Sequence, residues 1–156
     1  MSKSLTRVVA ALKAAGLCAQ PMEMTEDTRT APQAAAAAGC ALDQIVKSIL
    51  FRGVDSGGLH LFLTAGGNQV DPAKASALAD EGLERADAAI IRTVTGFAIG
   101  GVAPLGHLTP LPVRFDPRLL DFALVWAAAG TPRHIFPAAP RDLLRASGGV
   151  VADFTA

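Results

Sequence analysis

The chain has few of the residues that mark disulfide frameworks and metal sites. Its 156 residues include two cysteines, one tryptophan and no tyrosine. Cys18 and Cys40 lie far apart and lack the short Cys or His spacing of a zinc site. We therefore expect two reduced thiols, no metal site and no cofactor.

The chain also lacks an excess of positive or negative charge. Lys and Arg together number 14, as do Asp and Glu, so the formal net charge is zero. Such a chain has no global positive field to attract a nucleic-acid backbone, and RNA contacts would depend on a local arginine patch. Only four lysines are present (Lys3, Lys13, Lys47 and Lys74), so a lysine in an unusual setting stands out.

Long apolar runs are absent as well. No run approaches the ~20 residues of a membrane span, and the N-terminal apolar stretch is broken by Lys13. This pattern predicts a cytoplasmic protein without a membrane segment. A hydrophobic fraction of 51% and a mean hydropathy of +0.36 exclude a disordered chain. The length fits one domain, which we expect to span residues 1–156.

Caps, breakers and hydrophobic periodicity predict an irregular alternation of helices and strands. The predicted helices cover residues 4–15, 30–38, 42–46, 71–81, 87–94 and 140–146. The predicted strands cover residues 47–52 and 59–64, joined by a hairpin, and 83–85, 113–115, 122–128 and 150–153. This order predicts an α/β fold with a mixed sheet flanked by helices.

Lys47 fits its surroundings least. Strand alternation places it on the same face as the apolar Ile49 and Phe51. A lysine there either extends its amine to the solvated rim or meets an anionic ligand in a partly dry site. The pattern alone leaves both interpretations open.

Residues 97–112 contain three glycines and three prolines, which predicts the end of a strand followed by a rigid, shaped loop. In Gly100-Gly101-Val102-Ala103-Pro104, the glycine pair permits close approach of a ligand to backbone N–H groups. The loop could bind a carbonyl oxygen, an oxyanion or a ribose, and a plain turn is the alternative. It lacks the glycine patterns of phosphate-binding loops.

The three histidines lack the spacing of a metal site. His60 alternates with leucines and is expected to face solvent. His107 and His134 either line a pocket or are ordinary loop residues. No Gly-x-Ser-x-Gly motif is present, and neither cysteine lies in a nucleophile context, so covalent catalysis is not indicated.

Four segments, taken together and in order, resemble the YbaK family of free-standing aminoacyl-tRNA editing domains, which is similar to the insertion domain of bacterial prolyl-tRNA synthetase. They are residues 30–35 (TAPQAA), 44–51 (QIVKSILF), 95–104 (TGFAIGGVAP) and 150–153 (VVAD). The resemblance covers residues 5–153 and implies a curved, mixed, largely antiparallel sheet with helices packed around it.

The resemblance also implies a reaction. Such a domain hydrolyses the ester that joins a wrongly attached amino acid to the 3′-terminal adenosine of a tRNA, chiefly tRNA-Pro carrying alanine, cysteine or another small amino acid. Water attacks with help from the neighbouring ribose hydroxyl, so no protein nucleophile is needed. The implied partners are the acceptor end of aminoacyl-tRNA and, as a further candidate, prolyl-tRNA synthetase.

Site residues follow from the same resemblance. Lys47 is the signature residue, and with Gly100 and Gly101 it forms the predicted catalytic set. Ala103 stands where many members have serine, so any contact of that hydroxyl is lost. The predicted substrate-binding residues are Thr30, Phe97, Val102, Ala103, Pro104, His107, Gly130 and His134.

Two other functions remain open. One is a non-catalytic module of the same fold that binds tRNA ends, nucleotides or a protein; Ala103 and the zero net charge favour it, and Lys47 opposes it. The other is a small-molecule esterase, which is less favoured because no Ser/His/Asp arrangement can be assembled. Loss of the ester from charged tRNA distinguishes the deacylase from the binding module.

Overall fold

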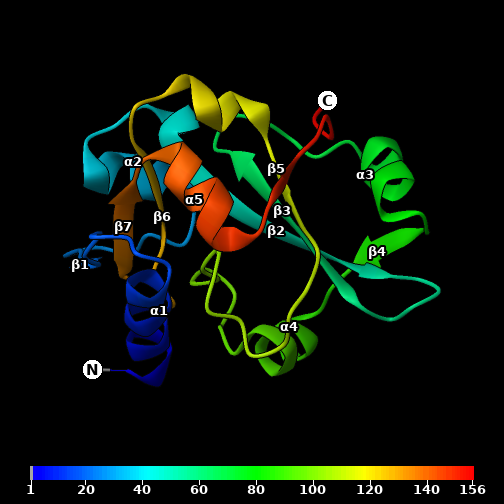
Figure 1. Cartoon of the computed structure of the whole chain (residues 1–156), viewed down its shortest axis with the longest axis horizontal. Helices are drawn as coiled ribbons and strands as arrows, with labels where there is room; N and C mark the ends of the chain where they lie inside the picture. The colour runs from blue at the N-terminus through cyan, green and yellow to red at the C-terminus, as the bar shows by residue number, and fades with distance from the viewer. Residues whose placement is uncertain (1) are drawn as a thin grey trace.

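The computed structural model describes residues 2–156 and has a mixed eight-stranded sheet with helices around it (Figure 1). The helices are α1 (Lys3–Ala14), α2 (Ala31–Ala38), α3 (Pro72–Ala79), α4 (Ala88–Thr95) and α5 (Pro140–Ser147), with the 3₁₀ helices η1 (Leu42–Gln44) and η2 (Pro117–Asp121). The strands are β1 (Met22–Glu23), β2 (Ile45–Gly53), β3 (Leu59–Ala65), β4 (Leu83–Arg85), β5 (Val113–Phe115), β6 (Val125–Ala128), β7 (His134–Ala138) and β8 (Val150–Val151).

The strand order is β1-β7-β6-β2-β3-β5-β8, and β4 pairs with β2 outside this path. The pairs β1–β7, β2–β3, β2–β4 and β6–β7 are antiparallel, whereas β2–β6, β3–β5 and β5–β8 are parallel. The predicted α/β fold with a mixed, largely antiparallel sheet is therefore confirmed. None of the helices in residues 2–156 is long and apolar enough to cross a membrane.

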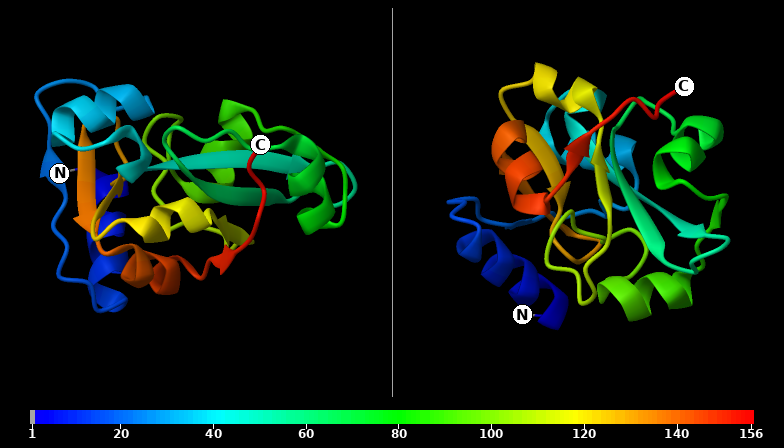
Figure 2. Two further views of the ribbon diagram at one scale, coloured as in Figure 1. Left: turned by 90° about the horizontal axis from the view of Figure 1, so that it is seen from above. Right: turned by 45° about the vertical axis from the view of Figure 1, so that its right-hand side comes forward.

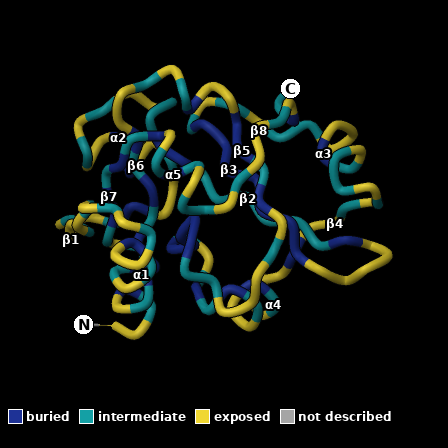
Figure 3. The backbone as a smooth tube through the Cα atoms, in the orientation of Figure 1, coloured by how far each residue is buried: buried dark blue, intermediate teal, exposed yellow. Residues whose placement is uncertain are grey.

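The β2–β3 hairpin forms the centre of the sheet. Its register runs from Val46 opposite Ala65 to Arg52 opposite Leu59. Every residue of β3 is buried (Figure 3). Figure 2 shows the hairpin running lengthwise through the molecule, with α1 and α2 at one end and α3 at the other. The hairpin predicted from the sequence is confirmed.

Both faces of the hairpin are covered. On one face, Val46 and Leu50 enter the larger core, which includes the fully buried Phe97. On the other face, Ile49 and Phe51 pack against a smaller core around Phe62. This alternation agrees with the sequence pattern and directs the side chain of Lys47 to the face of the smaller core.

The edge of β2 opposite β3 is paired at its two ends and open between them. Ile45 and Val46 pair with β6 in parallel. Residues 51–53 pair with β4 in the antiparallel sense. Residues 47–50 have no strand partner on this edge among residues 2–156, so the sheet divides here. The space left by this division becomes the cavity described below.

Two helices that border this space begin and end at the residues the sequence predicts. Thr30 and Gln33 form a reciprocal capping box at the start of α2, and Gly39 ends it with φ of 69°. Asp87 accepts a hydrogen bond from the Ile90 N–H at the start of α4, and Gly96 ends that helix with φ of 81°. These local signals agree with the tertiary fold.

Other boundaries differ from the prediction. Helix α1 begins one residue early because Ser2, not Ser4, is its N-cap. Helix α3 ends at Ala79, not at residue 81, because Asp80 adopts the left-handed conformation that an aspartate tolerates. The prediction of a helix over residues 42–46 is wrong, since η1 ends at Gln44 and Ile45 and Val46 pair with β6 in the sheet.

The predicted strand 122–128 begins late, at Val125, because η2 continues to Asp121. The strand predicted for residues 150–153 ends at Val151. Residues 97–112 contain no strand. The two-residue β1 carries no periodic signal and was not predicted. Both cysteines are free thiols, as expected.

Candidate functional site

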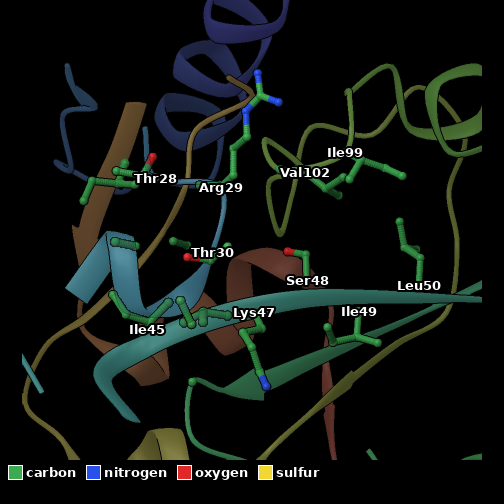
Figure 4. A pocket seen from close by; sticks show the side chains of 18 of the residues that line it. Thr28, Arg29, Thr30, Ile45, Lys47, Ser48, Ile49, Leu50, Ile99 and Val102 are labelled. Carbon is green, nitrogen blue, oxygen red and sulfur yellow. The ribbon is translucent and has the colours of Figure 1, made fainter. Parts of the chain in front are cut away.

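A cavity of about 600 Å³ occupies the division in the sheet (Figure 4). The open stretch of β2 lines one side of it. The start of α2 with the segment before it forms another wall, β6 a third, and residues 99–102 a fourth. The cavity thus depends on segments from most of the chain.

Lys47 is one of the residues that line this cavity, but its side chain points away from Thr30, Ser48 and Val102 (Figure 4). The amine donates a hydrogen bond to the carbonyl oxygen of Asn68. Burial lowers the pKa of Lys47, and the negative charges of Asp116 and Asp43 oppose this shift. The amine is therefore held by protein groups in a partly dry setting and is not fully solvated at a rim.

Asp116 organises the turn that holds this amine. It is 1% exposed. Its Oδ2 accepts hydrogen bonds from the Ala65 N–H at 3.0 Å and from the Asn68 side-chain amide at 2.9 Å, and its Oδ1 accepts from the Arg118 N–H at 2.9 Å. These bonds compensate for burying a carboxylate. Sequence reasoning missed Asp116, because Asp116-Pro117 indicates only a turn or the start of a helix.

Ser48 is a second residue that sequence reasoning missed. Its hydroxyl points into the cavity (Figure 4). The Gly53 N–H donates to Gly58 within the hairpin, so alternation turns the N–H and C=O of Ser48 toward the open edge of β2. This edge offers a ligand main-chain donors and acceptors beside a hydroxyl. A short polar residue after Lys47 was the available signal.

Only some residues of the glycine-proline loop line the cavity. Gly100 (φ 89°) and Val102 line the cavity, whereas Gly101, Ala103 and Pro104 are buried behind it. Gly101 needs no positive φ. Instead, a Cβ there would lie 2.8 to 2.9 Å from backbone atoms of Thr131, closer than real Cβ contacts. Ala103 does not line the cavity, so the missing serine hydroxyl removes nothing from its wall.

Four other predicted residues lie outside the lining. Phe97 is fully buried, with its ring edge-on to His107 at 5.9 Å between centroids. His107 Nε2 forms a hydrogen bond with the Ala103 carbonyl oxygen at 2.7 Å. Burial lowers the pKa of His107, and the positive charge of Arg7 lowers it further, whereas the hydrogen bond to Ala103 raises it. Gly130 packs against α1, and His134 Nδ1 lies 2.6 Å from Thr131 Oγ1.

The structure therefore brings together Thr30, Lys47, Gly100 and Val102 at the cavity, and it places the other predicted residues behind it or away from it. Their functional roles stay predictions. His60 lies elsewhere and does not face solvent: it is 8% exposed, and its Nε2 lies 2.9 Å from Glu81 Oε2. The expectation for His60 was wrong because α3 and the residues after it cover this part of β3.

The charged residues that line the cavity are Arg29, Lys47 and Arg85, and the described lining contains no carboxylate. The amine of Lys47 points away from the cavity, toward Asn68. The side chain of Arg29 is 60% exposed, and its Nε lies 3.8 Å from Oδ2 of Asp27. Within residues 2–156, no group of three or more His, Cys, Asp or Glu side chains could hold a metal ion. The cavity can therefore accept a ligand with apolar and anionic parts.

The fold and the cavity define an α/β protein with a largely apolar cavity at an open strand edge. Residues 25–146 match the model of the aminoacyl-tRNA editing domain, and the chain belongs to that family. The resemblance to YbaK-like editing domains is confirmed. The matched range contains the cavity residues but not α1.

Three relatives illustrate the similarity. A crystal structure of a proposed trans-editing enzyme for prolyl-tRNA synthetase is 45% identical and has a TM-score of 0.93, and the match covers 100% of this chain and 99% of that one. A protein from work on computational epitope grafting is 43% identical with a TM-score of 0.92 and the same coverage. The uncharacterized protein YwhH of Bacillus subtilis (strain 168) is 29% identical over 121 residues, which are 78% of this chain and 76% of that protein.

Proposed function

We propose that this chain is a trans-acting aminoacyl-tRNA deacylase that removes a small, wrongly attached amino acid from tRNA-Pro. The observation that carries the proposal is the cavity, which joins apolar walls, an open strand edge and the arginines Arg29 and Arg85, with no carboxylate among its described lining residues. The similarity to a proposed trans-editing enzyme for prolyl-tRNA synthetase supports the choice of tRNA. The whole chain acts as one editing domain, in the cytoplasm, on the acceptor end of aminoacyl-tRNA.

The ester of an aminoacyl-tRNA is labile, so the site needs to position water and stabilise a developing oxyanion. The open edge of β2 at Ser48 and the backbone at Gly100 supply fixed main-chain groups at the cavity. The terminal ribose and phosphate extend toward Arg29 and Arg85. Attack by water assisted by the ribose hydroxyl then requires no nucleophile from the protein.

Lys47 acts through charge in this proposal and not as a base. A charged amine has no free lone pair, and its acidic neighbours favour the charged form. When substrate enters, the amine exchanges the Asn68 carbonyl oxygen for an oxygen of the substrate. The exchange replaces one hydrogen bond with another, and the flexible stem of lysine permits it.

Selectivity in this proposal follows from the size of the aminoacyl end. The walls there are aliphatic or aromatic side chains such as Ile45, Val102 and Trp126. Steric overlap excludes larger side chains, whereas one missing methylene costs only about 1 to 3 kcal/mol. We therefore expect several small amino acids to be accepted and not a single one. Prolyl-tRNA synthetase is the candidate partner that would deliver the mischarged tRNA.

The test is release of amino acid from tRNA-Pro charged with alanine, cysteine, serine, 2-aminobutyrate or proline. We expect hydrolysis of small non-cognate esters and sparing of prolyl-tRNA. Lys47→Ala should lower the rate by roughly 100-fold or more, as loss of a transition-state contact does, with little change in melting temperature because the side chain is only half-buried. Lys13→Ala, an exposed lysine on α1, is the matched control.

One observation favours a second function. The Lys47 amine is bound to Asn68 and directed away from the cavity, an arrangement that suits a non-catalytic module for tRNA ends. That module would bind charged and uncharged tRNA without releasing amino acid. Binding without turnover for all five esters would therefore overturn the deacylase and support the module.

A further inference from the structure

Arg7 of α1 joins the two ends of the loop that supplies Gly100 and Val102 to the cavity. Its Nε donates to the Gly106 carbonyl oxygen at 2.9 Å. Its Nη2 donates to the carbonyl oxygen of Gly96 at 2.9 Å and to that of Thr95 at 3.4 Å. One guanidinium therefore bridges chain positions ten residues apart, as its planar fork of donors allows.

The same guanidinium has two further favourable contacts. It lies over the ring of the buried Phe97, with Cζ 4.6 Å from the centroid, which is a cation–π distance. The carbonyls of Thr95 and Gly96 are at the C-terminal end of α4, where the helix dipole attracts a cation. Arg7 thus contacts both the C-terminal end of α4 and Phe97, the residue that follows Gly96 in the loop.

Glycines let the loop lie close to α1 at both of its ends. Gly96 and Gly106 have φ of 81° and 80°, a conformation that other residues rarely adopt. A Cβ on Gly96 would clash with the Arg7 guanidinium, and a Cβ on Gly106 would lie 3.4 Å from Ala11 Cβ. The backbone is therefore shaped for this contact with α1.

Arg7 itself does not line the cavity, and α1 precedes the residues that match the family. We propose that Arg7 is a positioning residue: from behind, it holds residues 96–106 in the shape that places Gly100 and Val102 in the cavity wall. The effect of Arg7 on catalysis rests on the proposed deacylase function, whereas its effect on the order of the loop is independent of that function.

The first experiment measures amide hydrogen exchange in wild type, Arg7→Met and Lys13→Met. Three amides report on the loop and its exit: Gly101 donates to Ala98 O, Leu108 to Thr95 O and Thr109 to Val94 O. We expect these amides to exchange roughly tenfold faster in Arg7→Met, a loss of about 1.4 kcal/mol of local protection. Amides of the β2–β3 hairpin should keep their rates, and Lys13→Met, an exposed change on the same helix, should match wild type.

The second experiment measures deacylation by the same variants and by Arg7→Lys. Displacement of the wall should lower kcat/KM roughly 10- to 100-fold in Arg7→Met. Because Gly100 is proposed to contact the reacting ester, the loss should fall mainly on kcat and not on KM. Arg7→Lys keeps the charge but loses the fork, so it should recover part of the activity.

Three results would overturn the proposal. Unchanged exchange at Gly101, Leu108 and Thr109 would show that Arg7 does not order the loop. Equal acceleration at these amides and in the hairpin would assign Arg7 to general stability. Faster loop exchange with unchanged kcat/KM would remove its role in positioning for catalysis. If wild type deacylates none of the esters, the proposed function fails, and exchange still decides whether Arg7 orders the wall.

Discussion

The Lys47 amine is held by groups that come from distant parts of the chain. Alternation along β2 predicts its face, because Ile49 and Phe51 reveal the period of the strand. The role of Asn68 could not be predicted, because it depends on the turn after β3. The role of Asp116 follows only once β5 pairs with β3, fifty residues later. Local pattern thus finds the unusual residue, and tertiary pairing supplies its partners.

The partners of Glu81 likewise could not be predicted from the local sequence pattern. Its Oε1 accepts from the Ser56 N–H at 2.9 Å and the Asp55 N–H at 3.1 Å, and its Oε2 accepts from Ser56 Oγ at 2.8 Å and lies 2.9 Å from His60 Nε2. The Ser56 N–H and then His60 lower the pKa of Glu81 to about 2. A residue expected to end a helix instead fastens the hairpin turn to the chain after α3.

We expect this carboxylate to make stability depend on acid pH. The pKa of Glu81 falls from 4.5 to about 2 on folding, so ionised Glu81 favours the folded state above pH 4.5. That contribution is lost as pH falls from about 4.5 through 2. Urea unfolding at pH 6, 4 and 3 should show a smaller decline for Glu81→Gln than for wild type. Parallel declines in the two proteins would contradict the prediction.

Among the elements, those with their own start and stop signals are predicted best. Helices α2 and α4 follow from Thr30, Gly39, Asp87 and Gly96, since caps act within one turn. The division of the sheet is not predicted, because β6 and β4 reach β2 from eighty and thirty residues away along the chain. The cavity is a product of that division, so its lining could be predicted only through family resemblance.

The glycine-proline loop provides a prediction at this scale. In Gly101→Val, the new Cβ would meet the Thr131 backbone, so the loop must move away from the turn at residues 130–132. Overpacking of this kind costs about 1 to 3 kcal/mol in unfolding free energy, and the displaced wall should lower kcat/KM by roughly 10- to 100-fold. Thermal unfolding and deacylation kinetics measure the two effects.

The matched control is Gly58→Val in the exposed hairpin turn, where a Cβ would have only ordinary contact with Ser56 Oγ at 3.5 Å. It should keep near-normal kcat/KM. Near-normal rates in Gly101→Val would instead remove this loop from the site.

For the whole molecule, zero net charge limits the affinity for tRNA. Arg29 and Arg85 at the cavity and Arg133 nearby are the candidates for phosphate contacts, but Arg133 Nε already lies 3.5 Å from Asp27 and its Nη1 donates to Thr25 O. With about two or three phosphates neutralised, log K should fall with log salt at a slope of roughly 2 to 3 in magnitude.

Titrations with uncharged tRNA at several salt concentrations measure this slope. Arg29→Ala and Arg85→Ala should each reduce it by about one, whereas Arg141→Ala, exposed on α5, should leave it unchanged. Nanomolar affinity with a steep slope would mean that a large basic surface contributes.

Strands β1 and β8, the first and last in the strand order, are each two residues long. A strand edge of that length leaves very few free main-chain groups for a neighbouring molecule. Long, flat edges are the usual starting points for intermolecular sheet growth. Crowded molecules of this protein therefore find few main-chain groups at β1 and β8 for the addition of a strand, and the open edge of β2 at residues 47–50 lies at the cavity.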